Sequence, residues 1–181
     1  MAARRHLFIV PQLFYEAGVL TTPASCVDDP SSPLCAADVA RGVTRLLLRH
    51  ELIAMQEVPL DGGRRVDLMA LDARGQITIV EIKVSRADLV GDNKWQDYLP
   101  HCDRFFWAVP AGFDHTPIAS EAFLPERTGL IVADRYDAAV VREARTEPMN
   151  THARKKCTLA FARRAARRLV ALSDPEAVQG W

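Results

Sequence analysis

The chain has 181 residues, of which 49% are hydrophobic and 25% are charged. These proportions are those of one ordinary globular domain, and they exclude a chain disordered throughout, a collagen-like repeat and a coiled-coil rod. Lys plus Arg and Asp plus Glu both number 23, so the formal net charge is zero. A uniformly basic, histone-like nucleic-acid binder is therefore excluded as well.

The four cysteines lie too far apart in the sequence for a CxxC zinc motif, and their scatter does not indicate a disulfide scaffold; they are Cys26, Cys35, Cys102 and Cys157. The apolar run near the start is broken at Pro11, too early for a signal peptide or a membrane span. We therefore expect a cytoplasmic protein with no membrane association.

Two regions are expected along the chain. Residues 1–32 form an N-terminal extension, partly irregular, because Thr21–Ser32 is rich in Thr, Ser, Pro and Asp and shows no periodicity. Residues 33–175 form a single domain, which opens with an amphipathic helix that reaches about His50.

The rest of the domain alternates strand patterns with helical ones. Predicted strands cover Leu52–Leu60, Arg64–Leu71, Gln76–Val84, Arg104–Val109, Leu130–Ala133 and Ala138–Arg142. A polar helical stretch covers Arg86–Leu99, and a long helix covers Thr151–Leu172. The order α-β-β-β-α-β predicts an α/β fold with a mixed sheet flanked by helices.

The second hairpin of this sheet carries the candidate chemistry. A three-residue loop, Ala73–Gly75, sets a register in which strand residues on one face oppose each other across the hairpin. The opposed pairs are Leu71 with Ile77, Met69 with Ile79, Asp67 with Glu81, and Arg65 with Lys83. Two carboxylates therefore lie side by side, with a lysine on the same face.

Adjacent carboxylates repel unless a proton or a cation lies between them. Mg²⁺ favours one or two protein carboxylates with waters and phosphate oxygens, and Lys83 can stabilise the charge that develops on a phosphate. Asp67, Glu81 and Lys83 thus suit metal-assisted phosphodiester hydrolysis. The alternative is a solvated cross-strand charge cluster without a function.

The same residues carry a family resemblance. Asp67, thirteen further residues and Glu81-Ile82-Lys83 resemble the signature of the PD-(D/E)xK nuclease superfamily, with Val66 where the signature has proline. A narrower match, from Val39 to about Val109, resembles the MmcB-like DNA repair proteins, and its most specific segments are Lys94-Trp-Gln-Asp-Tyr98 and Cys102-Asp-Arg-Phe-Phe-Trp-Ala-Val109.

The resemblance implies a restriction-endonuclease-like core and DNA as the partner, with other DNA repair proteins as further partners. It also implies that Asp67 and Glu81 hold the metal, Mg²⁺ or Mn²⁺, and that Lys83 is catalytic. Some members of the superfamily keep the fold without the activity, so a non-catalytic DNA-binding or damage-response accessory protein stays open. An RNA-processing nuclease is a third possibility, because nothing but the resemblance separates DNA from RNA.

Three further residues are candidates for the site. Glu57 is either an additional acidic ligand or a surface carboxylate. Lys94 and Tyr98 follow the Glu-x-Lys strand and either contact substrate phosphates or, in the case of Tyr98, belong to the core.

The final helix is the second candidate for nucleic-acid contact. Residues 142–168 carry nine Lys or Arg against two acids. Helical spacing places Arg163, Arg164, Arg167 and Arg168 on one arc. The opposite arc is expected to pack on the domain and contains Leu159, Phe161, Ala162, Ala165, Ala166, Leu169 and Leu172. We expect the arginine arc either to contact phosphates or to be a solvated charged face.

Overall fold

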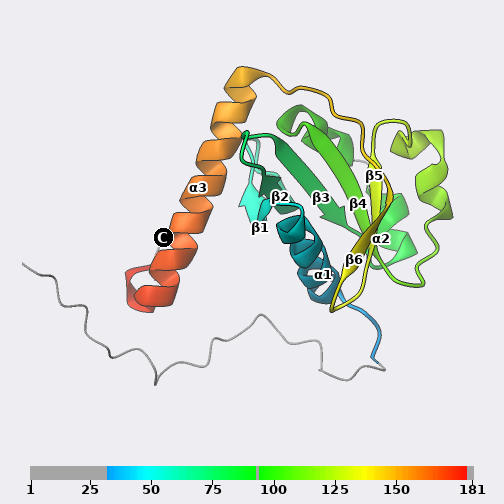
Figure 1. Cartoon of the computed structure of the whole chain (residues 1–181), viewed down its shortest axis with the longest axis horizontal. Coiled ribbons are helices and arrows are strands. Elements are labelled where there is room, and N and C mark those ends of the chain that lie inside the picture. Colours follow the sequence, from blue (N-terminus) through cyan, green and yellow to red (C-terminus); the bar gives the residue numbers. More distant parts are fainter. Residues whose placement is uncertain (1–31, 93, 179–181) are drawn as a thin grey trace, which may run out of the picture.

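The computed structural model describes residues 32–92 and 94–178. The expected N-terminal extension therefore lies outside the described residues, apart from Ser32, and the domain boundaries stay predictions. The described chain forms one six-stranded mixed sheet in the order β1-β2-β3-β4-β5-β6, with helices on both faces (Figure 1).

The sheet is built from a meander, a parallel centre and a final antiparallel strand. Strands β1, β2 and β3 are antiparallel neighbours, β3, β4 and β5 are parallel, and β6 is antiparallel to β5. The strands are β1 Ile53–Pro59, β2 Arg65–Leu71, β3 Ile77–Ile82, β4 Arg104–Pro110, β5 Gly129–Ala133 and β6 Ala138–Arg142. The predicted α/β fold with a mixed sheet is confirmed.

The helices confirm the expected order α-β-β-β-α-β, the order expected for a restriction-endonuclease-like core. They are α1 Ala36–Arg49, α2 Arg86–Gly91 and α3 Thr151–Ser173, with 3₁₀ turns η1 Trp95–His101, η2 Thr116–Ala119, η3 Glu121–Phe123 and η4 Pro175–Val178. The polar stretch expected as one helix is thus split into α2 and η1.

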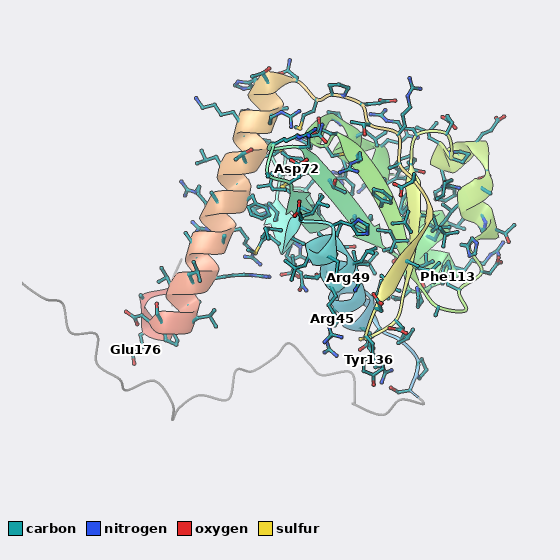
Figure 2. All side chains as sticks on the ribbon, in the orientation of Figure 1. Arg45, Arg49, Asp72, Phe113, Tyr136 and Glu176 are labelled. Atoms are coloured by element: carbon teal, nitrogen blue, oxygen red, sulfur yellow. The ribbon has the colours of Figure 1, made fainter. Side chains whose placement is uncertain are left out.

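Helix α1 covers one face of the sheet because its apolar positions recur at helical spacing. Val39, Val43 and Leu46 are buried against strand residues of that face. Gly42 lets the helix approach the β5–β6 turn, since a Cβ there would lie 2.3 Å from the Asp134 carbonyl oxygen. Figure 2 shows Arg45 and Arg49 of α1 beside Tyr136 of this turn.

The other face is covered by an aromatic cluster. The Trp95 ring lies 5.1 Å from that of Trp107 and 5.4 Å from that of Phe105, and Phe123 packs against the same group. These contacts fix η1 on the sheet, because Trp95 is its first residue. Tyr98, one turn later, is consequently buried at the edge of β2.

Helix α3 is anchored at its start and extends past the sheet beyond β1 (Figure 1). Cys157 and Phe161 are its buried residues. The expectation that its whole apolar arc packs on the domain is wrong, because Leu159, Leu169 and Leu172 are 57%, 66% and 60% exposed. The last turns of the helix lie beyond the sheet that would have covered them.

Two further observations concern membranes and thiols. Within the described residues, no helix has the length and apolar character needed to cross a membrane. Cys102 and Cys157 are buried free thiols, as expected, whereas Cys35 is disulfide-bonded, which the scatter of the cysteines did not predict.

Candidate active site

Asp67 and Glu81 are brought together by the β2–β3 hairpin. The predicted register is confirmed at four pairs: Leu71 with Ile77, Ala70 with Thr78, Met69 with Ile79, and Leu68 with Val80. Asp67 follows directly, and its Oδ2 accepts a hydrogen bond of 2.8 Å from the backbone N–H of Ile82. The two carboxylates consequently belong to neighbouring strands at the same end of the hairpin.

The Glu81 carboxyl is buried, with 6% of the residue exposed. Burial and, second, the Asp67 carboxylate raise its pKa to about 8, against the opposing effect of Lys83. Burial also raises the pKa of Asp67, against the hydrogen bond from Ile82. Within the described part of the chain, Glu81 Oε2 has no hydrogen-bond partner although it is buried.

Lys83 lies just beyond the end of β3 and is held there by its backbone N–H, which donates to the Ala108 carbonyl over 2.9 Å. Its ammonium is buried among three carboxylates. Nζ lies 2.7 Å from Asp92 Oδ2, 3.6 Å from Glu81 Oε1 and 3.7 Å from Asp88 Oδ1. Burial alone would lower the pKa of Lys83, but Asp92, Glu81 and Asp88 outweigh burial and raise it.

Asp92 and Asp88 are site residues that the sequence did not reveal. Asp92 follows α2 directly, and Asp88 lies in the first turn of that helix. Both approach Lys83 only because α2 folds back on the end of β3. The one signal in the sequence was that Asp92 lies in the polar stretch Arg86–Leu99 after the Glu-x-Lys strand, which gives its location but not its partner.

The donor set fits a hard divalent cation. Glu81 Oε2 is a buried carboxyl oxygen without a partner among the described residues, and Asp67 presents a second carboxyl group beside it. Among residues 32–92 and 94–178, no three His, Cys, Asp or Glu side chains are arranged around one point as metal ligands. Two carboxylates suit Mg²⁺, which keeps several waters and substrate oxygens in its coordination shell.

Of the secondary candidates, the structure brings Tyr98 to the site and leaves Lys94 at its edge. Tyr98 donates a hydrogen bond of 3.4 Å from its hydroxyl to the Arg65 carbonyl. Burial, together with the carboxylates of Glu81, Asp92 and Asp67, raises the pKa of Tyr98 to about 12. Lys94 is exposed, and its backbone N–H donates to Asp92 Oδ1 over 3.0 Å.

Glu57 is engaged by two arginines. Its carboxylate lies 3.2 Å from Arg164 Nη2 and 3.6 Å from Arg65 Nη2. Its φ of 57° places a non-glycine residue in the left-handed region inside a strand, which is rare and costs energy. Glu57 thus connects β1 to α3 by an ion pair.

The four arginines of α3 do not form one uniform exposed face. Arg163 and Arg167 are exposed, whereas Arg164 is half-buried on Glu57. Burial lowers the pKa of Arg168, and the nearby Arg164 lowers it further. Arg163, Arg164 and Arg167 line a groove between α3 and the end of β1, together with Pro59, Leu60 and Asp61.

Comparisons with known proteins point to one family. The family model described as "DNA repair protein MmcB-like" matches residues 24–176. A solved structure of the SPO1766 protein of unknown function from Silicibacter pomeroyi is 43% identical, with a TM-score of 0.70, and the match covers 79% of this chain and 94% of that one. No curated protein matches.

A more distant solved structure is that of Pyrococcus furiosus SfsA in complex with Ca²⁺. It is 12% identical over 59% of this chain and 61% of that chain, with a TM-score of 0.32. A similarity at this level carries no argument about the site.

Proposed function

The chain belongs to the family of MmcB-like DNA repair proteins, and from that premise we propose that it hydrolyses DNA phosphodiesters with Mg²⁺ or Mn²⁺ at a site formed by Asp67, Glu81 and Lys83. The observation that carries the proposal is the buried Glu81 carboxylate, one oxygen of which has no partner among the described residues, beside a second carboxylate. A buried charge of this kind needs a cation or a proton.

In this proposal Asp67 and Glu81 hold the ion. A bound divalent ion supplies neutralisation of the phosphate and activation of a water. Glu81 must lose its proton before it can serve as a ligand, because burial raises its pKa to about 8. The site therefore becomes competent as the pH approaches 8.

Lys83 acts as a cation in this proposal and not as a general base. Its neighbours raise its pKa, so the ammonium stays charged at neutral pH. A charged donor held within a buried site stabilises negative charge that develops on a phosphate oxygen. Asp92, at 2.7 Å, keeps that ammonium charged and oriented.

The test is cleavage of supercoiled, linear duplex, single-stranded and branched DNA with Mg²⁺ and with Mn²⁺. The wild-type protein should cleave at least one form, and Lys83→Ala should be slower by at least about a hundredfold, the usual scale for one electrostatic catalytic group. Arg74→Ala, which changes an exposed basic residue in the β2–β3 turn at the other end of the hairpin from Asp67 and Glu81, is the matched control and should keep the wild-type rate.

If the wild-type protein cleaves no DNA form with either metal but binds DNA, a non-catalytic accessory role on the same fold replaces the nuclease. If RNA of the same forms is cleaved and DNA is not, the protein is an RNA-processing nuclease. A panel that contains both nucleic acids therefore separates all three functions.

A further inference from the structure

A long groove follows helix α3. Its first part has a volume of about 330 Å³ and lies between α3 and the end of β1, and its second part has a volume of about 460 Å³ and lies between α3 and η4. The two parts adjoin, because Arg164 and Arg167 line both of them. The helix residues that line this α3 groove extend from Lys156 to Ala171, a length of roughly 22 Å at 1.5 Å per residue.

Part of the lining of the α3 groove is apolar and open to solvent. Leu159 and Val170 line the groove and are 57% and 43% exposed, and Pro59 at the end of β1 is exposed as well. Leu159, Ala166 and Val170 recur at helical spacing, so they lie on one side of α3. A row of exposed apolar side chains in a concave surface is typical of a binding site.

The rest of the lining is basic. It contains five basic side chains and one acid, which are Lys156, Arg163, Arg164, Arg167 and Arg168, and Asp61. Lys156 pairs with Asp61, and Arg164 pairs with Glu57. The other three arginines make no ion pair within residues 32–92 and 94–178, and α3 itself contains no Asp or Glu. The groove therefore keeps three uncompensated positive charges, which favour an anionic partner.

The combination of apolar and basic lining separates the possible occupants. Duplex DNA would use the arginines through its phosphates but not the apolar side chains, and the lining contains no aromatic ring on which the bases of a single strand could stack. A second copy of α3 would bring like charges together, because the helix has no acid. A bilayer is contacted by the convex apolar face of an amphipathic helix and not by a groove.

We propose that the α3 groove binds an amphipathic helix of a partner protein, with leucine-like side chains on one face and Asp or Glu beside them. The apolar face of this helix packs on Leu159 and Val170, and its carboxylates pair with Arg163 and Arg167. A groove of roughly 22 Å accommodates about 15 residues of helix. No residue of the metal site takes part, so this proposal does not depend on the proposed nuclease activity.

The test is fluorescence anisotropy with a labelled peptide of about 15 residues. The probe has Leu at i, i+3, i+4 and i+7 along a helix and Glu at the other positions. The wild-type protein should bind it saturably. A peptide of the same composition in scrambled order has no leucine face, so it should bind at least about tenfold more weakly, the factor that burial of one leucine contributes.

One substitution tests the apolar part of the lining. Leu159→Ser should weaken peptide binding by about tenfold, because it removes a buried leucine contact. Leu172→Ser is the matched control and should bind as the wild type does, since Leu172 is an equally exposed leucine of α3 that does not line the groove.

A double substitution tests the basic part. Arg163→Gln combined with Arg167→Gln should weaken peptide binding by about threefold to tenfold at low salt and make the binding less dependent on salt. Arg41→Gln combined with Arg74→Gln is the matched control and should change little, because both arginines are exposed and lie outside the groove.

Duplex DNA in the same assay separates a peptide from a nucleic acid, because Leu159→Ser should leave DNA binding unchanged. Absence of saturable peptide binding, equal binding of the scrambled peptide, or equal binding by the wild type and Leu159→Ser would each overturn the proposal. DNA binding that is weakened by Leu159→Ser would assign the groove to nucleic acid instead. Self-association in sedimentation that Leu159→Ser abolishes would assign it to a second copy of the chain.

Discussion

Burial of Glu81 gives the protein an acid whose charged form is disfavoured in the folded chain. Its pKa is raised from the ordinary value of 4.5 to about 8. The folded state therefore binds a proton that the unfolded state releases between these two pH values. The stability that this group contributes is complete below about pH 4.5 and is lost as the pH rises to about 8.

The first prediction follows from the direction of this pH dependence. Glu81→Gln keeps the shape of the side chain and removes its titration, so without metal it should be more stable than the wild type at pH 8 by at least about 1 kcal/mol. At pH 4 the difference should be small, because the wild-type carboxyl is then mostly protonated in both the folded and the unfolded state. Urea unfolding at both pH values in the presence of a chelator measures this, and equal differences at the two pH values would contradict the raised pKa.

The second prediction concerns Asp92, which contacts Lys83 at 2.7 Å and is nearly buried. Burial lowers the pKa of Lys83, and the Asp92 carboxylate offsets that effect. Asp92→Asn removes this negative charge, so the pKa of Lys83 should fall. In the proposed nuclease, cleavage should slow by about tenfold or more, and its alkaline limit should move to lower pH. Asp88→Asn is the control, because this exposed carboxylate lies 3.7 Å away and should matter less. An unchanged pH profile in Asp92→Asn would remove Asp92 from this role.

At the scale of elements, α3 is fixed to the sheet by an ion pair between a half-buried arginine and a buried aspartate. Asp103, just before β4, accepts from Arg154 at 2.7 and 2.8 Å and from the backbone N–H of Ile77 at 2.7 Å. Arg154 also donates to the Gly75 carbonyl in the β2–β3 turn. The pair joins α3, the hairpin turn and β4, so it holds the hairpin that carries Asp67 and Glu81.

The third prediction is that Arg154→Met destabilises the fold by about 2–3 kcal/mol, because it leaves the Asp103 carboxylate buried without its counter-ion. Lys156→Met is the matched control: its exposed ion pair with Asp61 should contribute less than about 1 kcal/mol. Urea midpoints measure both. Equal effects of the two substitutions would show that Asp103 is satisfied without Arg154.

The fourth prediction concerns nucleic-acid binding by α3. Arg163 and Arg167 are exposed, so each can contact a phosphate of duplex DNA. Replacing both with Gln should make the slope of log K against log salt shallower, by about 0.9 for each phosphate contact that is lost. Arg164→Gln should change the slope less, because the Arg164 guanidinium is already hydrogen-bonded to Glu57. Fluorescence anisotropy at several salt concentrations gives the slopes. An unchanged slope in the double variant would mean that this face points away from the DNA.

The β2–β3 hairpin could be predicted because its determinants are local. Gly75, with its φ of 76°, sets the turn, and the alternation of apolar residues on both sides sets the register. The packing of α3 could not be predicted in this way. Its helical spacing indicated an apolar arc, but not that the sheet ends before Leu169 and Leu172.

The ion pairs of α3 could not be predicted from the sequence either. Asp103, Asp61 and Glu57 pair with Arg154, Lys156 and Arg164 of α3, and all three acids lie at least 50 positions away in the sequence. Acids within the helix are the only partners that sequence spacing reveals. Asp92 was missed for the same reason, since its contact with Lys83 depends on where α2 folds.

Over the whole molecule, the sheet separates two chemically different faces. One carries Glu81 and Lys83 beside α2 and η1, and the other is apolar and covered by α1. Helix α3 extends beyond β1, and η4, marked by Glu176 in Figure 2, follows at its end. The acidic site and α3 are joined through Glu57 and Arg164.

The central claim is that Asp67 and Glu81 share one divalent cation, and calorimetric titration with Mn²⁺ tests it most directly. The wild type should bind Mn²⁺ at pH 8 and less tightly below it, by roughly tenfold for each pH unit, because Glu81 must lose a proton with a pKa of about 8. Asp67→Asn should lose this binding, while Lys94→Ala should keep it. Equal Mn²⁺ binding by the wild type and Asp67→Asn would contradict the claim.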